Sequence, residues 1–136
     1  MYSYSEENTQ QALHKGLTPE QSHLLQEARV AVVGLGGLGS NVAMWLARLG
    51  VGHLLLYDFD KVELSNLNRQ YYFFEDVGKY KAEALLAKLQ QVNPYGDYQS
   101  KVARLTEANL EELLAPAHII CEALDKAEAK AMLVNG

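Results

Sequence analysis

The chain has 136 residues, of which 49% are hydrophobic and 21% charged, and its formal net charge is −5. This length allows one domain with one core. The acidic balance argues against a nucleic-acid-binding surface, which needs clustered Lys and Arg, so small molecules and proteins are the expected partners. No apolar run approaches the roughly 20 residues of a membrane span, and we expect a cytoplasmic protein. The single cysteine, Cys121, excludes an internal disulfide.

The first 28 residues predict a helical segment that precedes the main domain. Thr18 is followed directly by Pro19 and, three residues after the Thr, by Gln21. A capping Thr, a Pro at the first helical position and a Gln at the third are typical of a helix start. We therefore assign residues 1–28 to an N-terminal helical segment.

The rest of the chain alternates apolar strands with amphipathic helices. Four runs predict strands, at residues 30–33, 53–57, 97–103 and 117–124. Four stretches predict helices, at residues 40–49, 79–92, 106–114 and 126–134. In the first of these helices, Trp45 lies on the apolar stripe that we expect to face the core. The alternation predicts an α/β fold, a Rossmann-like parallel sheet with helices on both faces.

We assign residues 29–136 to this Rossmann-like, ATP-binding domain. A complete sheet of this kind usually has about six strands, whereas the sequence predicts four. We therefore expect the chain to be the N-terminal portion of a longer domain. The alternative is a minimal complete domain whose open edge is covered by a partner. In either case the strand at residues 117–124 would be an apolar edge, which favours self-association.

A glycine-rich turn joins the first predicted strand to its helix. Its glycines are Gly34, Gly36, Gly37 and Gly39. Such a turn lets backbone N–H groups approach phosphate oxygens, and the following helix start adds partial positive charge. Asp58 ends the next strand, where a carboxylate can accept hydrogen bonds from ribose hydroxyls. The pattern predicts a nucleotide site, although NAD, FAD and adenylate-forming enzymes share it; the alternative is glycines that serve helix–strand packing alone.

A polar segment after the second predicted strand indicates which class of nucleotide-binding protein this is. Residues 58–70 read Asp-Phe-Asp-Lys-Val-Glu-Leu-Ser-Asn-Leu-Asn-Arg-Gln, and Gly-Lys-Tyr-Lys follows at residues 78–81. Together with the glycine-rich turn and with Asp125 after the fourth predicted strand, this run resembles the ThiF/MoeB/ubiquitin-activating superfamily over residues 28–134. The Arg-Gln-Tyr-Tyr continuation is most like the short ThiF-type proteins of thiamine biosynthesis.

The resemblance implies an ATP-dependent adenylyltransferase that acts on a ubiquitin-like sulfur carrier protein, forms a homodimer and uses Mg²⁺. The C-terminal carboxylate of the carrier would attack the α-phosphorus of ATP, giving an acyl-adenylate and pyrophosphate. A carboxylate is already ionised at neutral pH, so the chemical need is positioning and neutralisation of phosphate charge.

The same resemblance implies roles for particular residues. Arg69, Lys81 and Asp125 would form the catalytic set, and Asp125 with Asp60 would bind Mg²⁺ through oxygen ligands. Further nucleotide contacts would come from Ser65, Asn66, Asn68 and Gln70. The plainer alternatives are that Arg69 and Lys81 are solvated surface charges and that the two aspartates cap a loop and a helix.

The sequence departs from the superfamily pattern at two positions, and three other functions are compatible with it. Lys126 follows Asp125 where many members have Asn, and no Arg precedes Arg29 to reach a dimer mate, a role that is absent or falls to Lys15. The other functions are a tRNA-modifying dehydratase of the same superfamily, an NAD- or FAD-dependent oxidoreductase and a non-catalytic nucleotide-binding module. We expect these 136 residues alone to bind nucleotide with weak or absent catalysis.

Overall fold

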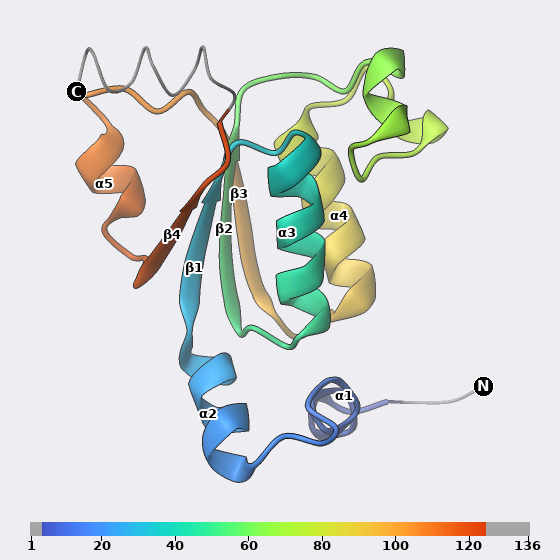
Figure 1. The fold of residues 1–136 in the computed structure, drawn as a ribbon, viewed down its shortest axis with the longest axis vertical. Coiled ribbons are helices and arrows are strands. Elements are labelled where there is room, and N and C mark those ends of the chain that lie inside the picture. The colour runs from blue at the N-terminus through green and yellow to red at the C-terminus, as the bar shows by residue number, and fades with distance from the viewer. Residues whose placement is uncertain (1–3, 125–136) are drawn as a thin grey trace.

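The structure is a computed structural model, and it describes residues 4–124 (Figure 1). The helices are α1 (Glu6–Leu13), α2 (Pro19–Glu27), α3 (Gly37–Arg48), α4 (Lys81–Val92) and α5 (Leu110–Leu114), with the 3-10 helices η1 (Leu64–Asn68) and η2 (Phe74–Asp76). The strands are β1 (Arg29–Val33), β2 (His53–Asp58), β3 (Asp97–Val102) and β4 (Ile119–Glu122). Asp125 and the helix predicted at 126–134 lie outside the described residues. Within residues 4–124, no helix has the length and apolar character that crossing a membrane requires.

The four strands form one parallel sheet in the order β3-β2-β1-β4. Helices α3 and α4 cover one face of the sheet and α5 lies on the other (Figure 1). This arrangement confirms the predicted Rossmann-like α/β fold. β4 is the last strand of the order, and Ile119 and Ile120 are 53% and 49% exposed, so β4 forms the expected apolar edge of the described sheet.

The core is divided by the sheet into two layers. Successive side chains of a strand point to opposite faces, so Val30 and Val32 of β1 pack with α3 and α4, whereas Ala31 and Val33 pack towards α5. All four side chains are buried. This two-sided burial explains why β1 is a continuous apolar run rather than an alternating one.

Two predicted helices differ from their observed form. The prediction that Trp45 faces the core is wrong, because its side chain is 64% exposed and the buried residues of α3 are Gly39, Ser40, Ala43, Met44 and Ala47. Four of these five residues are small, which lets the helix lie close to the sheet. The helix predicted at 106–114 begins only at Leu110, since Asn109 accepts the Thr106 N–H (2.7 Å) in a turn that precedes it.

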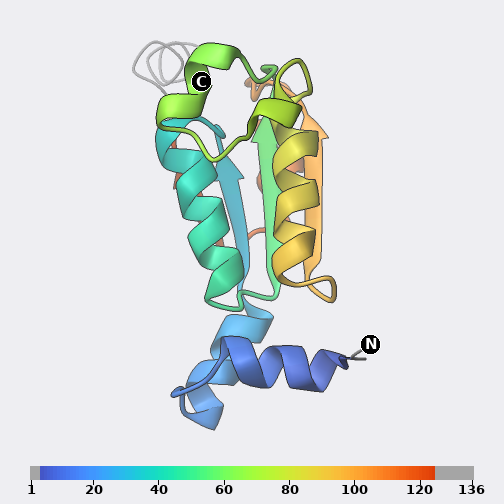
Figure 2. The same cartoon turned by 90° about the vertical axis from the view of Figure 1, so that its right-hand side faces the viewer.

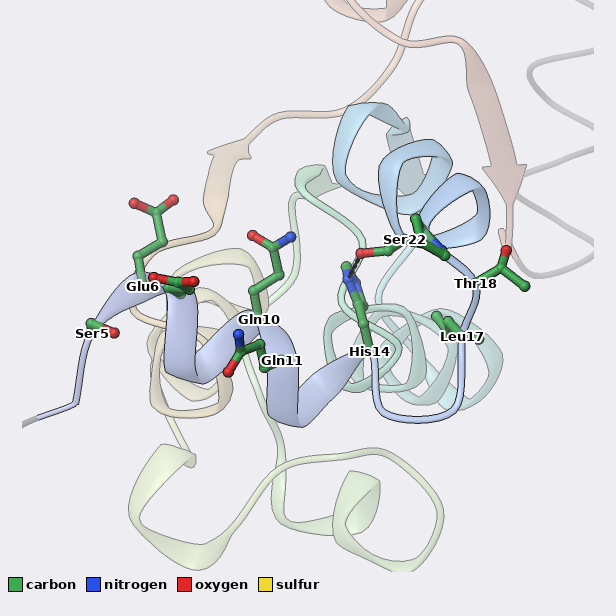
Figure 3. Close-up of a pocket in the computed structure, with 10 residues that line it drawn as sticks. Ser5, Glu6, Gln10, Gln11, His14, Leu17, Thr18 and Ser22 are labelled. Carbon is green, nitrogen blue, oxygen red and sulfur yellow. Dashed lines mark hydrogen bonds between the residues drawn. The ribbon is translucent and has the colours of Figure 1, made fainter.

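The N-terminal segment contains two helices, α1 and the predicted α2, at the amino ends of the strands (Figure 2). His14 connects them to the sheet domain, with its Nδ1 2.6 Å from Ser22 Oγ and its Nε2 2.9 Å from the Gly50 carbonyl oxygen. A cavity of about 700 Å³ lies beside His14 between the two helices (Figure 3). It is at the opposite end of the strands from the glycine-rich turn and does not coincide with the predicted site (Figures 1 and 2).

Candidate functional site

The glycine-rich turn lies at the carboxyl end of β1, where the order of the sheet changes direction. The chain passes outward from β1 to β2 and β3 and then returns to place β4 on the other side of β1. Ligands of open parallel sheets bind at this kind of switch point, outside the carboxyl ends of the strands. The η1 and η2 loops lie at the same end, beside the start of α3 (Figure 2, green).

The four glycines of the turn have two different roles. Gly34 has φ +90°, and a methyl group there would lie 2.9 Å from the Ala123 carbonyl oxygen. A methyl group at Gly39 would lie 1.7 Å from the Gly34 carbonyl oxygen, so both glycines are required by the fold itself. At Gly36 and Gly37 a methyl group would meet nothing closer than 3.7 Å. A side-chain clash among the described residues therefore does not explain these two glycines, which lie at van der Waals distance from the side chains of Gln70 and Arg69.

Helix α3 starts at the turn with backbone donors that no described side chain accepts from. It begins at Gly37, and within residues 4–124 no side chain caps its N-terminus. The first N–H groups of a helix have no partner within the helix, and together with the helix dipole they attract anions. An uncapped start beside two glycines that packing does not require fits the phosphate groups of a nucleotide.

Asp58 forms a hydrogen bond with the backbone of the glycine-rich turn. Its Oδ2 accepts the Leu35 N–H and its Oδ1 accepts the Asp60 N–H, both at 2.7 Å. Burial raises the pKa of the Asp58 carboxyl, while these two hydrogen bonds and the nearby Lys81 oppose the shift. Each carboxylate oxygen keeps capacity for a further hydrogen bond. In the structure, Asp58 therefore stabilises the loop backbone. The predicted contact of Asp58 with a ribose remains a prediction.

Arg69 reaches the same turn from η1. Its Nη1 donates to the Ser65 carbonyl oxygen (3.3 Å) and to Asn68 Oδ1 (3.0 Å), and its Cγ lies 3.7 Å from the position of a methyl group on Gly37. Asn41 joins the two segments, because its Nδ2 donates to the carbonyl oxygens of Gly37 (2.6 Å) and Arg69 (3.0 Å). The guanidinium stays exposed near the start of α3, where a forked cation can bind phosphate oxygens.

Lys81, the first residue of α4, is buried. It is only 7% exposed, and within residues 4–124 its ammonium makes no ion pair or hydrogen bond. Its backbone N–H donates to the Asp60 carbonyl oxygen at 2.9 Å, and its charge is near enough to Asp58 to lower the pKa of that carboxyl. The fully buried polar atoms without a partner among the described residues do not include its ammonium nitrogen, so the buried part is the aliphatic stem and the charged end can bind an anionic ligand. The buried stem argues against the alternative of a freely solvated surface charge.

The remaining predicted residues mainly shape the loop in this structure. Asn66 is buried, with its Oδ1 accepting the Glu63 N–H (2.7 Å) and its carbonyl accepting the Gln70 N–H (2.9 Å). Gln70 is also buried, and its Oε1 has no hydrogen-bond partner among the described residues. Asp60 is exposed. No group of three or more His, Cys, Asp or Glu in residues 4–124 could hold a metal ion, so Asp60 and Asp125 as Mg²⁺ ligands remain a prediction.

Two residues that contact the turn were not predicted from the sequence. Ser40 Oγ donates to the Gly36 carbonyl oxygen (2.5 Å) and accepts the Tyr71 N–H (2.9 Å). The Tyr72 hydroxyl donates to the Leu35 carbonyl oxygen (2.7 Å). Ser40 directly follows the last glycine of the turn, and that position was the available signal. Nothing local indicates Tyr72, which is 37 residues away from Leu35 in the chain.

Three features of residues 4–124 are typical of a Rossmann-like nucleotide-binding domain: the order of the sheet, the glycine-rich turn at its switch point, and the start of α3, which no described side chain caps. The chain belongs to the ThiF family, whose family model matches residues 8–135. This finding confirms the resemblance inferred from residues 58–70.

Individual relatives agree with the family assignment. The chain is 42% identical over 108 residues to the sulfur carrier protein adenylyltransferase of Thermus thermophilus, an alignment that covers 79% of this chain and 40% of the relative. It is 35% identical over 127 residues to the molybdopterin-synthase adenylyltransferase of Escherichia coli, covering 93% and 51%. The structure of E. coli tRNA N6-threonylcarbamoyladenosine dehydratase with ATP is similar at a TM-score of 0.85 and 29% identity, covering 98% and 56%. The chain thus spans about half the length of these relatives.

Proposed function

We propose that the chain is the nucleotide-binding part of an ATP-dependent adenylyltransferase that activates the C-terminal carboxylate of a ubiquitin-like sulfur carrier protein. The observation that carries this proposal is Lys81, whose stem is buried and whose ammonium has no bonded partner within residues 4–124. It lies at the same end of the sheet as the start of α3, which no described side chain caps. A cation at this position suits the phosphates of any bound nucleotide, so the choice of an activating enzyme rests on the relatives. Relatives named as adenylyltransferases support the choice.

In the proposed reaction a carrier carboxylate oxygen forms a bond to the α-phosphorus of ATP, and the bond from that phosphorus to the bridging oxygen breaks. The acyl-adenylate and pyrophosphate are the products. The N–H groups at the start of α3 would orient the phosphates, and Arg69 and Lys81 would neutralise the charge that moves to the leaving pyrophosphate. Mg²⁺ held by Asp60 and Asp125 would supply further positive charge.

Two finer assignments belong to the same proposal. The Arg-Gln-Tyr-Tyr sequence at residues 69–72 favours a carrier of thiamine biosynthesis. The similarity to the dehydratase structure favours a second candidate, in which the activated carboxylate belongs to a modified tRNA nucleoside. The net charge of −5 counts against a tRNA substrate, because binding nucleic acid requires clustered basic residues.

Mass spectrometry of the carrier tests the activity. Full-length protein, ATP and a ubiquitin-like carrier with a free C-terminal glycine should give a carrier heavier by one AMP, and EDTA should abolish the product. The control is the same carrier with an amidated C-terminus, which has no carboxylate to attack. No mass gain on any carrier, with adenylation of a tRNA nucleoside instead, would favour the dehydratase. Tighter binding of NADH than of ATP would support an oxidoreductase.

The exposed side of α3 supports the proposal that the protein is a homodimer. Leu38, Trp45 and Leu49 are 63%, 64% and 54% exposed and follow one another at a spacing of seven and four residues, which places them on one face of the helix. A single apolar helix stripe can pack against its own copy across a two-fold axis, because an isologous interface needs only one self-complementary patch. We therefore propose that a second copy covers this stripe.

Trp45→Glu should convert the dimer to a monomer, because it would place a charge in the centre of the stripe that the second copy is proposed to bury. Light scattering coupled to gel filtration gives the mass directly. The matched control is Leu24→Glu, since Leu24 is a similarly exposed apolar residue (69%) on α2. A dimer that survives Trp45→Glu and dissociates with Leu24→Glu would place the interface on the N-terminal helices instead.

A further inference from the structure

Both peptide groups of Leu35, in the middle of the glycine-rich turn, are held by side chains from elsewhere in the chain. The Leu35 N–H donates to Asp58 Oδ2 and the Leu35 carbonyl accepts from the Tyr72 hydroxyl, each at 2.7 Å. Leu35 itself is 0% exposed and Tyr72 only 3%. Leu35 lies between Gly34 and Gly36, and glycine has the greatest backbone freedom of all residues. The two side chains therefore restrain a segment that would otherwise be the most adaptable part of the site.

The Tyr72 hydroxyl also determines the direction of the Gly36 N–H. The Leu35 carbonyl and the Gly36 N–H belong to one planar trans peptide unit, so they point in opposite directions. Because Tyr72 draws the carbonyl towards the buried side, the N–H turns away from it. Within residues 4–124 the Gly36 N–H has no acceptor, and Gly36 is the N-cap of α3.

We infer that Tyr72 is a positioning residue for the nucleotide phosphates, acting through the Leu35–Gly36 peptide unit. The inference rests on the proposed function, in which the N–H groups at the start of α3 bind ATP. Tyr72 does not touch the phosphates; it keeps the N–H of Gly36 directed away from the buried side before the ligand arrives, which removes a reorganisation cost from binding. Burial raises the pKa of Tyr72, so the hydroxyl keeps its proton and remains a donor at neutral pH.

Tyr57 offers a matched comparison within the same chain. Its hydroxyl also donates to a backbone carbonyl, that of Leu113 (2.5 Å), and its side chain is 7% exposed. It packs with Leu113 in the cluster on the α5 side of the sheet, whereas Tyr72 packs in the cluster on the α3 and α4 side. Loss of either hydroxyl leaves one buried carbonyl without its donor, with a similar expected loss of stability. The Tyr57 carbonyl oxygen accepts the Gly34 N–H (2.9 Å), a contact that Tyr57→Phe keeps, so only the loss of the Tyr72 hydroxyl removes a hydrogen bond to the turn.

The test compares Tyr72→Phe with Tyr57→Phe in the full-length protein; both variants keep the ring and remove only the hydroxyl. NMR order parameters of the Gly36 and Gly37 amides, measured without nucleotide, should fall in Tyr72→Phe and stay unchanged in Tyr57→Phe. Titration calorimetry should show ATP affinity lower by about tenfold in Tyr72→Phe, on the scale of one hydrogen bond, and unchanged in Tyr57→Phe. Melting temperatures should fall similarly in both.

Unchanged order parameters at Gly36 and Gly37 in Tyr72→Phe would overturn the inference, whatever the ATP affinity. Equal losses of ATP affinity in the two variants would also overturn it, because general destabilisation would then explain both. A wild-type protein that binds no ATP would instead refute the proposed function. The order parameters, which need no nucleotide, would still decide whether Tyr72 restrains the turn.

Discussion

Lys81→Met and Arg69→Ala should each lower carrier-dependent ATP–pyrophosphate exchange by at least about a hundredfold, the scale of losing one preorganised electrostatic donor. Lys81 is buried beside Asp58, and Arg69 passes over Gly37 at the start of α3. Met retains the apolar stem of the buried lysine and removes only the charge. Exchange of radiolabelled pyrophosphate into ATP measures the effect on the full-length protein.

The control for these two variants is Lys101→Met, which removes a positive charge from an exposed position on β3. It should leave exchange unchanged, since the Lys101 side chain makes no hydrogen bond or ion pair within residues 4–124 and, unlike Arg69, does not lie against the glycine-rich turn. Melting temperatures without ATP should show that all three proteins are folded. Exchange at the wild-type rate in both Lys81→Met and Arg69→Ala would exclude these residues from the mechanism.

Substitutions in the glycine-rich turn should separate folding from binding. Gly39→Ala should destabilise the protein by at least about 3 kcal/mol, because its methyl group would lie 1.7 Å from the Gly34 carbonyl oxygen and would force α3 away from β1. Gly37→Ala should leave stability unchanged or slightly higher, because its methyl group would meet nothing closer than 3.7 Å and alanine favours a helix. That methyl group should nevertheless lower ATP affinity by at least about tenfold, since it occupies the space proposed for the phosphates.

Urea denaturation and titration calorimetry on both variants give the two quantities separately. If Gly37→Ala binds ATP like the wild type, the phosphates do not approach this part of the turn. If Gly39→Ala is as stable as the wild type, the close contact between α3 and β1 is not required by the fold.

For helix α3, the local spacing of apolar residues predicted the helix but not its buried face. Its apolar spacing predicted a helix, and the helix is present, but the face was assigned wrongly. The usual assumption is that the largest apolar residues face the core. Here the residues of α3 that are buried are Gly39, Ser40, Ala43, Met44 and Ala47, with Leu46 partly buried against the same core, and Trp45 lies outside. The missed α1 had a comparable local signal, the capping box of Ser5 and Asn8, but few apolar residues to support it.

The sequence by itself determined the alternation of strands and helices, the turn at residues 34–39 and the family to which residues 58–70 point. These features depend on neighbours within a few residues: apolar spacing, helix caps and glycine freedom. Only the tertiary structure decided that Asp58 and Tyr72, 23 and 37 residues from Leu35, bind the same loop. It also decided that the stem of Lys81 is buried and that its ammonium has no bonded partner within residues 4–124. Contacts of that separation depend on how β1, β2 and α4 pack around one edge of the sheet. No local preference of a side chain contains that information.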